Sequence, residues 1–289
     1  VIELTLAEKG DPGVPFSWLC FGSEGRREQT LYTDQDNGIL FEARDAAEAA
    51  DIRQRLLPIA QQINQHLAAC GFTLCKGNIM AGNPDLCLSR AEWARRFAAF
   101  IREATPENLL ASTIYFDLRV VWGDEQGCAQ LRRGILEQVA DNRLFQRMMA
   151  DNALRHRPPV GRFREFVLER KGSDKATLDL KVQGLTPFVD GARLLALANG
   201  VEANNTLERL RQLVALDVIE PLDGGAYEEA YHFIQQTRMQ QHQLQTRENR
   251  PYSNRVDPDS LNQLDRRILR EALRQAQRLQ SSLALRYQL

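Results

Sequence analysis

The chain has 289 residues, of which 43% are hydrophobic and 26% charged, and its 37 Lys and Arg nearly balance its 38 Asp and Glu. This length predicts two domains, and the composition is ordinary for a soluble globular protein. The near-neutral charge disfavours a nucleic acid as the main partner, and no apolar run is long enough to span a membrane. Five cysteines, an odd number without CxxC spacing, favour reduced thiols in a cytoplasmic protein over disulfides or structural zinc.

The N-terminus gives no sign of export. Residues 1–8 carry no basic flank and no long apolar core, so they do not form a signal peptide. The chain begins without an initiator Met, which leads us to expect a fragment with regulatory parts upstream.

Two strands are expected early in the chain. Residues 16–21 are aromatic and apolar, and they run into Gly22 and Gly25, which break the strand and start a turn or a short helix. Residues 33–41 end in an apolar run, so we expect a second strand with acidic residues at its start.

Helices and a loop are expected next. Residues 45–70 carry apolar side chains at helical spacing, with a kink or break at Pro58. Glycine, asparagine and proline punctuate residues 71–89, which predicts a loop-rich segment. A further helix is expected to begin near Ser89, because Glu92 three residues later completes a capping box.

The strongest strand signal covers residues 113–122. Because side chains alternate along a strand, Asp117 and Arg119 are expected on one face of it. Nearly all of the chain beyond this point has helical patterns. We therefore predict an α+β head at residues 1–127, a small mixed sheet flanked by helices, followed by an all-helical bundle at residues 128–289.

Three boundaries are predicted within the bundle. Thr186 and Pro187 indicate an N-cap and a first helical position. Residues 223–225 predict a break before a long glutamine-rich helix. The last helix is expected to start near residue 259 or 260 and to carry one continuous apolar stripe. This stripe packs in the core or, alternatively, forms the seam of a homodimer.

Asp34 and Asp36 stand two residues apart at the start of the second strand, so both carboxylates point off one face. Two like charges this close raise a pKa or call for a cation between them, and oxygen ligands favour Mg²⁺ or Mn²⁺. A pair of such metals clamps the attacking and leaving oxygens of an in-line phosphoryl displacement. Asp117 is the candidate third carboxylate, and Arg119 would orient it or meet a phosphate.

Gly22 and Ser23 directly follow the first strand. Glycine lets the backbone turn sharply and approach a ligand closely. Backbone N–H groups, the serine hydroxyl and a following helix N-terminus together suit a triphosphate. Arg26 or Arg27 would add a guanidinium fork to its oxygens.

An isolated Asp-x-Asp pair has a simpler interpretation, because such pairs often cap the backbone of turns. The combination is more specific: an apolar strand, Gly22-Ser23, ten residues, and then Asp34-x-Asp36 at a second strand. Cys75, in the loop-rich segment, is interpreted as a packing residue, with thiol chemistry as the minor alternative.

The spacing of Gly22-Ser23 and Asp34-x-Asp36 resembles the signature of the DNA polymerase β-like nucleotidyltransferase superfamily. The fuller string GSEGRREQTLYTDQDN at residues 22–37 looks like a narrower group, the DUF294 family of nucleotidyltransferases, which is related to bacterial protein-PII uridylyltransferases. Later segments are also similar to that family, and the last of them looks like the start of its C-terminal substrate-binding helical domain. These segments are residues 75–81, 116–119 and 178–193.

The resemblance implies roles for particular residues. Asp34, Asp36 and Asp117 would bind the metals and carry the chemistry, with a nucleoside triphosphate as donor. Lys181 and Arg193 would reach the nucleotide or the acceptor from the bundle. The whole implied nucleotide-binding set is Gly22, Ser23, Arg26, Arg119, Lys181 and Arg193. The resemblance also implies cyclic-nucleotide-binding and CBS domains upstream, and so a place in signal transduction.

Three functions remain open at this point. The first is an enzyme that transfers a nucleoside monophosphate from ATP, UTP or another triphosphate to an acceptor hydroxyl and releases pyrophosphate. A regulatory protein is the expected acceptor, by analogy with the uridylyltransferases. The second is a non-catalytic module that senses a nucleotide or Mg²⁺, and the third is an interaction platform. Three convergent acids favour the enzyme.

Overall fold

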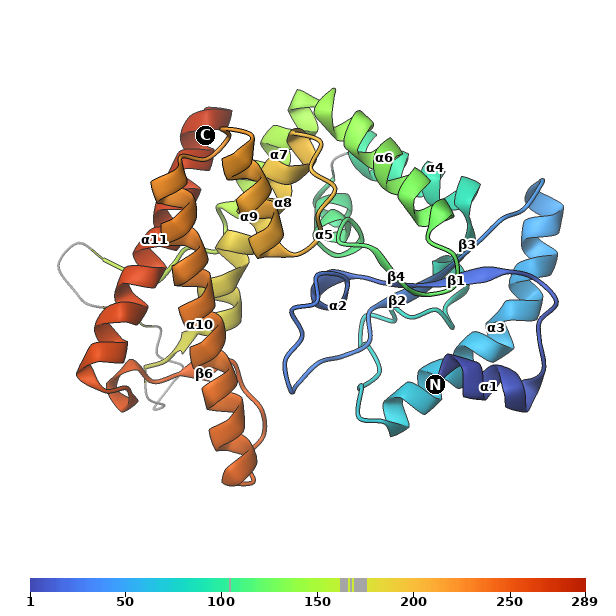
Figure 1. Cartoon of the computed structure of the whole chain (residues 1–289), viewed down its shortest axis with the longest axis horizontal. Coiled ribbons are helices and arrows are strands. Elements are labelled where there is room, and N and C mark those ends of the chain that lie inside the picture. Colours follow the sequence, from blue (N-terminus) through green and yellow to red (C-terminus); the bar gives the residue numbers. More distant parts are fainter. Residues whose placement is uncertain (104, 162–165, 167, 169–175) are drawn as a thin grey trace. The chain divides into compact units, whose positions relative to one another are not determined.

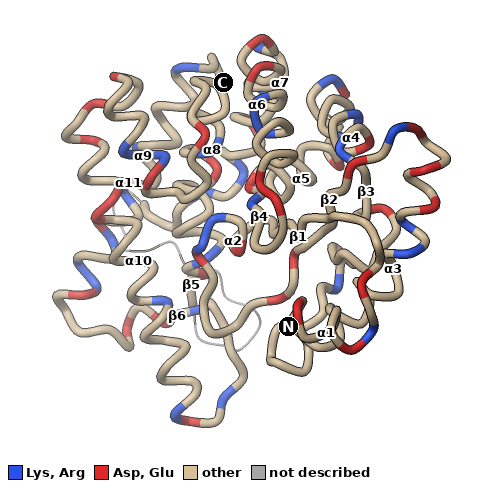
Figure 2. The backbone as a smooth tube through the Cα atoms, turned by 45° about the vertical axis from the view of Figure 1, so that its right-hand side comes forward, with Lys and Arg blue, Asp and Glu red and all other residues tan. Residues whose placement is uncertain are grey.

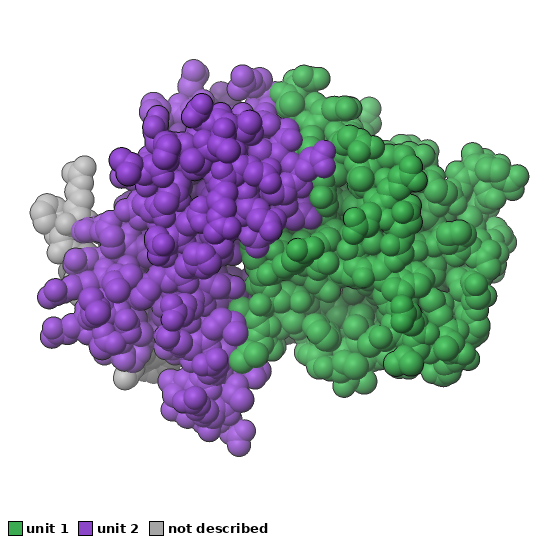
Figure 3. All heavy atoms as spheres, in the orientation of Figure 1, with its two compact units in different colours: residues 1–142 green, residues 143–289 purple. Residues whose placement is uncertain are grey.

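The computed structural model describes all residues except 104, 162–165, 167 and 169–175. The chain divides into two compact units, Val1–Asn142 and Arg143–Leu289, which Figure 3 colours separately. The first is an α+β unit with a small mixed sheet, and the second is largely helical, which confirms the predicted fold class. Within the described residues, no helix has the length and apolar character needed to cross a membrane.

A four-stranded sheet forms the centre of the first unit (Figure 1). Its order is β3-β2-β1-β4, with β1 antiparallel to both β2 and β4, and β2 parallel to β3. Cys20 at the end of β1 lies opposite Asn37 of β2 and Arg119 of β4. The end of β1 and the starts of β2 and β4 therefore meet at the same end of the sheet. The strands are β1 (Phe16–Cys20), β2 (Asn37–Phe41), β3 (Cys87–Ser89) and β4 (Arg119–Trp122).

Helices cover both faces of this sheet. Every residue of β1 and β2 is therefore buried. Buried strands of this kind carry continuous apolar runs rather than alternation. The helical segments of the unit are α1 (Ile2–Lys9), α2 (Gly22–Gly25), α3 (Ala46–Ala69), η1 (Pro84–Leu86), α4 (Arg90–Arg102), α5 (Pro106–Tyr115) and α6 (Gln126–Ala140).

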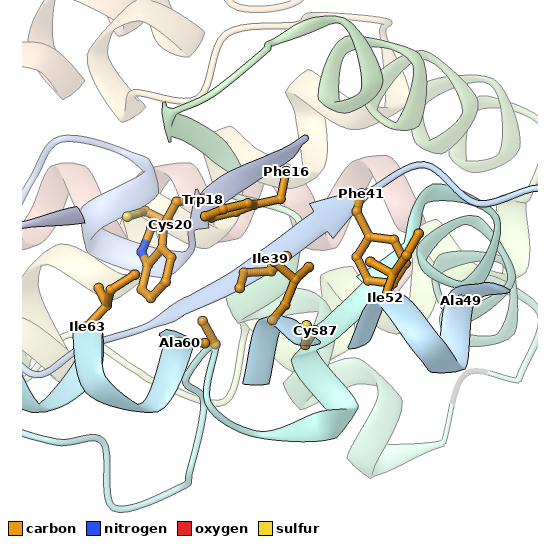
Figure 4. Close-up of a cluster of buried hydrophobic side chains, with 12 residues drawn as sticks. Phe16, Trp18, Cys20, Ile39, Phe41, Ala49, Ile52, Ala60, Ile63 and Cys87 are labelled. Atoms are coloured by element: carbon orange, nitrogen blue, oxygen red, sulfur yellow. The ribbon is translucent and has the colours of Figure 1, made fainter. Parts of the chain in front are cut away.

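The core between the sheet and α3 fixes the position of both (Figure 4). Trp18 of β1 and Ile39 of β2 are cross-strand partners, and they pack with Ile52 and Ile63 of α3. Each buried side chain of this size stabilises the fold by about 1.5–3 kcal/mol. The central strands of the sheet are thus anchored to α3.

Several predicted boundaries in the first unit hold, and others move. The capping box at Ser89 and Glu92 is present at the start of α4. Of the kink or break expected at Pro58, the break does not occur, because α3 runs from Ala46 to Ala69 through this residue. The sequence division at residue 127/128 falls inside α6, which packs against α4 and β2 of the first unit.

The strand predicted at residues 113–122 is wrong over its first half. Residues 113–115 belong to α5, where Thr105 caps the backbone N–H of Asn108 and Pro106 occupies the first turn, and residues 116–118 connect α5 to the next strand. The hydroxyl of Thr113 donates to the carbonyl of Leu110 inside the helix, so a β-branched residue is accommodated there. Strand β4 begins at Arg119, and Asp117 lies before it instead of on its face.

The second unit is built around one buried helix. All residues of α8 from Pro187 to Leu197 are buried, and α8 packs against the helices on either side. A helix that is buried all round belongs at the centre of a bundle. The elements are α7 (Arg143–Ala153), β5 (Leu178–Asp179), η2 (a π-helix, Leu180–Leu185), α8 (Thr186–Ala198), α9 (Thr206–Ala215), α10 (Pro221–Arg247), β6 (Arg255–Val256), η3 (Pro258–Ser260) and α11 (Gln263–Tyr287).

The break predicted at residues 223–225 is wrong, because α10 runs through both glycines from Pro221. A Cβ on Gly224 would lie 2.3 Å from Cγ2 of Val214, so this glycine allows α9 to approach closely. Thr186 lies inside the helix instead of capping it, because the π-helix η2 leads directly into α8.

Helix α11 begins later than predicted. Asn262 caps it by accepting from the backbone N–H of Asp265 at 2.9 Å, while residues 258–260 form η3. Its buried stripe starts at Leu269 and continues to Tyr287, and it packs against α7, α8 and α10 of the same unit. The stripe is therefore core, as the first of the two interpretations expected.

Candidate active site

The turn after β1 brings the Gly-Ser motif beside the second acid of the pair. Phe21 donates its backbone N–H to the carbonyl of Asp36 at 2.8 Å. Gly22 adopts φ +54°, a left-handed conformation that favours glycine, and a Cβ there would lie 3.4 Å from Oδ2 of Asp36. Ser23 follows in α2 and is half-buried. The Asp36 carboxylate thus faces the turn at Gly22.

The acidic pair lies just before β2, not within it. Asp34 is exposed and forms an isolated bridge with Thr73, and Asp36 is half-buried. Gln35 between them is 2% exposed and Asn37 after them is 1% exposed, so these two side chains point inward. Alternation therefore places both carboxylates outward on the same side, as the spacing predicts.

A buried network of amide side chains holds this segment from behind. Asn64 of α3 donates from Nδ2 to Gln35 Oε1 at 2.8 Å and to Asn37 Oδ1 at 2.9 Å. Its Oδ1 accepts from the N–H of Gly82 at 2.9 Å, and Asn37 Oδ1 accepts from the N–H of Ala81 at 2.8 Å. Buried amides are costly unless satisfied, so this network fixes one arrangement of the strand, α3 and the loop that follows α3.

Cys75 joins the acidic pair from that loop. Its Sγ and one carboxylate oxygen each from Asp34 and Asp36 all lie within 4.8 Å of one another. Burial raises the pKa of the Cys75 thiol, and the negative charge of Asp36 adds to this. Among the described residues, these three are the group of His, Cys, Asp and Glu side chains close enough to share a cation.

The structure places Asp117 in a different environment. Its carboxylate is fully buried and accepts from Nη1 of Arg26 at 2.5 Å, while Nε of Arg26 donates to Glu28 at 2.6 Å. A Cβ on Gly25 would lie 1.7 Å from the carbonyl oxygen of Asp117, so the two backbones touch. Asp117 and Arg26 therefore lock α2 onto the chain that enters β4, and Asp117 is not in the group formed by the other two acids.

Arg119 binds the C-terminal end of α2. Its Nη2 donates to the carbonyl of Glu24 at 3.1 Å and its Nε to the carbonyl of Gly25 at 3.3 Å. The carbonyl of Glu24 also accepts from the backbone N–H of Arg27 at 3.0 Å, so Arg119 adds a second donor at this helix end. Burial raises the pKa of the Glu24 carboxyl, which lies beside the thiol of Cys20. Arg119 thus contacts backbone in the structure.

Lys181 and Arg193 lie in the second unit. Arg193 is 2% exposed, and its Nη1 donates to Asp190 at 2.6 Å one turn earlier on α8. Lys181 is exposed at the start of η2, where its backbone N–H donates to Oδ1 of Asp179 at 2.9 Å. The ion pair between Arg193 and Asp190 is buried within the second unit.

Comparison with protein families gives two matches. Residues 1–107 match the family described as "Putative nucleotidyltransferase DUF294", and residues 143–287, half of the chain, match "Putative nucleotidyltransferase substrate binding domain". The chain belongs to the DUF294 family. No curated protein matches it. The family assignment confirms the resemblance seen in the sequence and supports a transferase class.

A DUF294 nucleotidyltransferase implies a nucleoside triphosphate and a divalent cation, so the donor atoms must suit such an ion. Asp34 and Asp36 offer carboxylate oxygens, the ligands that Mg²⁺ and Mn²⁺ prefer. Their two negative charges also repel each other unless a cation lies between them. These two residues fit the implied ion, whereas a thiol such as that of Cys75 suits softer metals.

Sequence reasoning missed four residues that shape this DUF294 site. Gln35 and Asn37 alternate with the two acids, and this alternation is the signal that could have identified them as inward-facing. Asn64 follows the core residue Ile63 on α3 and carries no signal of its own. Cys75 was interpreted as a packing residue, and its neighbours come from a segment 40 residues earlier, which local patterns do not reveal.

Proposed function

We propose that the first unit transfers a nucleoside monophosphate from a nucleoside triphosphate to an acceptor hydroxyl, with release of pyrophosphate. The supporting observation is that the Asp34 and Asp36 carboxylates converge beside the glycine turn at Gly22, in a chain of the DUF294 family. When bound there, a divalent cation neutralises charge on the phosphate oxygens during in-line displacement.

The chain's own residues position these groups. Asp34 and Asp36 bind the cation, and the backbone and hydroxyl at Gly22 and Ser23 contact the phosphates. The amide network around Asn64 holds the acids in register before any ligand arrives. Preorganised charges of this kind need no rearrangement during the reaction.

We assign Asp117 and Arg26 a positioning role through their buried ion pair. Arg119 acts in the same way on the carbonyls of α2. The third-acid role of Asp117 stays a prediction. Contacts of Lys181 with the nucleotide or the acceptor remain predictions.

The proposed acceptor is a hydroxyl of a regulatory protein, which follows from the relation of the family to protein-PII uridylyltransferases. A protein acceptor suits a chain whose charge is near zero, because nucleic-acid binding relies on many basic contacts. Figure 2 shows that the helices of both units carry residues of both signs.

The test uses each α-³²P-labelled nucleoside triphosphate with Mg²⁺ or Mn²⁺ and a lysate of the source cell. Wild type is compared with Asp36→Asn and with the control Asp51→Asn, which removes an exposed carboxylate on α3. Label on one protein with wild type and the control, but not with Asp36→Asn, supports the proposal. Equal labelling by Asp36→Asn refutes it. Nucleotide binding without any label supports the sensing module instead.

A further inference from the structure

Cys75 is held beside the acidic pair by backbone contacts on both sides of it. Before it, the carbonyl of Thr73 accepts from the N–H of Gln35 at 2.9 Å. After it, the carbonyl of Ile79 accepts from the N–H of Asn37 at 3.1 Å. The loop is thus tied at two points to the segment that carries the acids. The position of the thiol is therefore set by the fold and not by a freely moving loop.

The donor set formed in this way is mixed. Two carboxylate oxygens suit Mg²⁺, which accepts oxygen ligands, but a thiolate suits Zn²⁺, Co²⁺ or Cd²⁺. The ligand atoms lie within 4.8 Å of one another, close enough for one ion to contact all three after small side-chain rotations. Zn²⁺ takes sulfur and oxygen ligands at roughly 2.0–2.3 Å in a tetrahedral arrangement. The fourth position would stay open to water or substrate.

The other cysteines do not share this arrangement. Cys20, Cys87 and Cys128 are buried in the first unit, and Cys70 is exposed at the end of α3. Within the described residues, Cys75 is the cysteine found in a group of three metal-ligand side chains. Two segments separated in sequence thus bring different donor types to one point.

We propose that Asp34, Asp36 and Cys75 form a site for a thiophilic divalent cation of the Zn²⁺ class, which competes with Mg²⁺ and stops transfer. On binding, the sulfur–hydrogen bond of Cys75 is replaced by a sulfur–metal bond, and the proton passes to water. No electron is transferred. The inhibitory consequence rests on the proposed function, whereas the thiolate–metal bond can be observed without any turnover.

The test replaces Zn²⁺ with Co²⁺, whose thiolate complexes absorb in the near ultraviolet. The reduced, metal-free protein is titrated with Co²⁺ under argon, and Mn²⁺ binding is followed separately by electron paramagnetic resonance. We expect a saturable charge-transfer band in wild type and in the control Cys70→Ser, and none in Cys75→Ser. Cys75→Ser should weaken Zn²⁺ binding by at least ~10–100-fold. Loss of a residue that only hydrogen-bonds to a metal ligand already costs this much.

The outcomes separate this inference from the proposed function. If wild type binds Mn²⁺ but shows no thiolate band with Co²⁺, the inference is wrong and the proposed function is unaffected. A band that persists in Cys75→Ser also overturns it. If neither Mn²⁺ nor Co²⁺ binds, both proposals fail. In the labelling assay, the transfer rate of each protein is expressed relative to its own rate with Mg²⁺ alone. The Zn²⁺ concentration that halves this relative rate should be higher for Cys75→Ser than for wild type.

Discussion

Replacing Asn64 by alanine tests whether the buried amide network sets the geometry of the acidic pair. Asn64 is 4% exposed, and its side chain makes three hydrogen bonds, to Gln35, Asn37 and Gly82. Alanine removes all three and leaves the N–H of Gly82 without that acceptor. The two other amides keep a contact with each other, from Asn37 Nδ2 to Gln35 Oε1 at 3.4 Å.

The size of the effect follows from these contacts. Three hydrogen bonds at about 1 kcal/mol each give a loss of roughly 3 kcal/mol. Alanine is the better helix former inside α3, which returns about 0.5 kcal/mol. The free energy of unfolding of the first unit should therefore fall by about 2.5 kcal/mol, and the corresponding Tm by roughly 5–10 °C.

The measurement is urea unfolding followed by tryptophan fluorescence, with Trp18 and Trp93 as reporters in the core of the first unit. The matched control is Gln65→Ala, an exposed neighbour on the same helix, which should change stability by less than about 0.5 kcal/mol. Mn²⁺ binding should weaken in Asn64→Ala and not in Gln65→Ala. An unfolding free energy for Asn64→Ala equal to that of the control would refute the reasoning.

Three further predictions concern packing, charge and pH. Gly25→Ala should lower the free energy of unfolding by more than about 3 kcal/mol, because the new Cβ would overlap the carbonyl of Asp117. The control Gly134→Ala places its Cβ in open space on a helix and should raise the Tm slightly in thermal melts. Asp117→Asn should lower the unfolding free energy by about 3 kcal/mol and leave Mn²⁺ affinity unchanged; a folded variant that loses Mn²⁺ would restore the third-acid role. Burial and, to a smaller extent, the positive charge of Arg238 hold the pKa of His242 below its usual value. The unfolded chain therefore takes up a proton at about pH 6.5 that the native chain does not. Stability should therefore be present above that pH and fall as the pH drops through it, and calorimetry should show this slope removed in His242→Phe.

Much of the candidate active site could be predicted because local sequence patterns encode it. The apolar strand at 16–20 and the alternation around Asp34 and Asp36 depend on nearest neighbours along the chain. The same holds for the capping box at Ser89 and Glu92. Each is a short-range feature, and the structure retains each of them.

The errors arise where tertiary contacts decide between two readings. Residues 113–116 are aromatic and β-branched, yet they form the end and the C-cap of α5, where Tyr115 and Phe116 pack with aromatic residues of α4. Gly224 looked like a break, but its contact with Val214 shows that it permits close helix packing.

The environment of Asp117 depends on Arg26, 91 residues earlier. Whether a carboxylate meets a cation or a guanidinium is settled by three-dimensional proximity, which a single sequence does not display.

The double anchoring of the loop at residues 73–81 also has a consequence in time. Its hydrogen bonds to Gln35 and Asn37 break only when the loop separates from the segment before β2 and from α3. Amide protons at Ala81 and Asn37 should therefore exchange with deuterium together, in one cooperative opening. Hydrogen-exchange rates there would report how often the metal-binding edge comes apart as a whole.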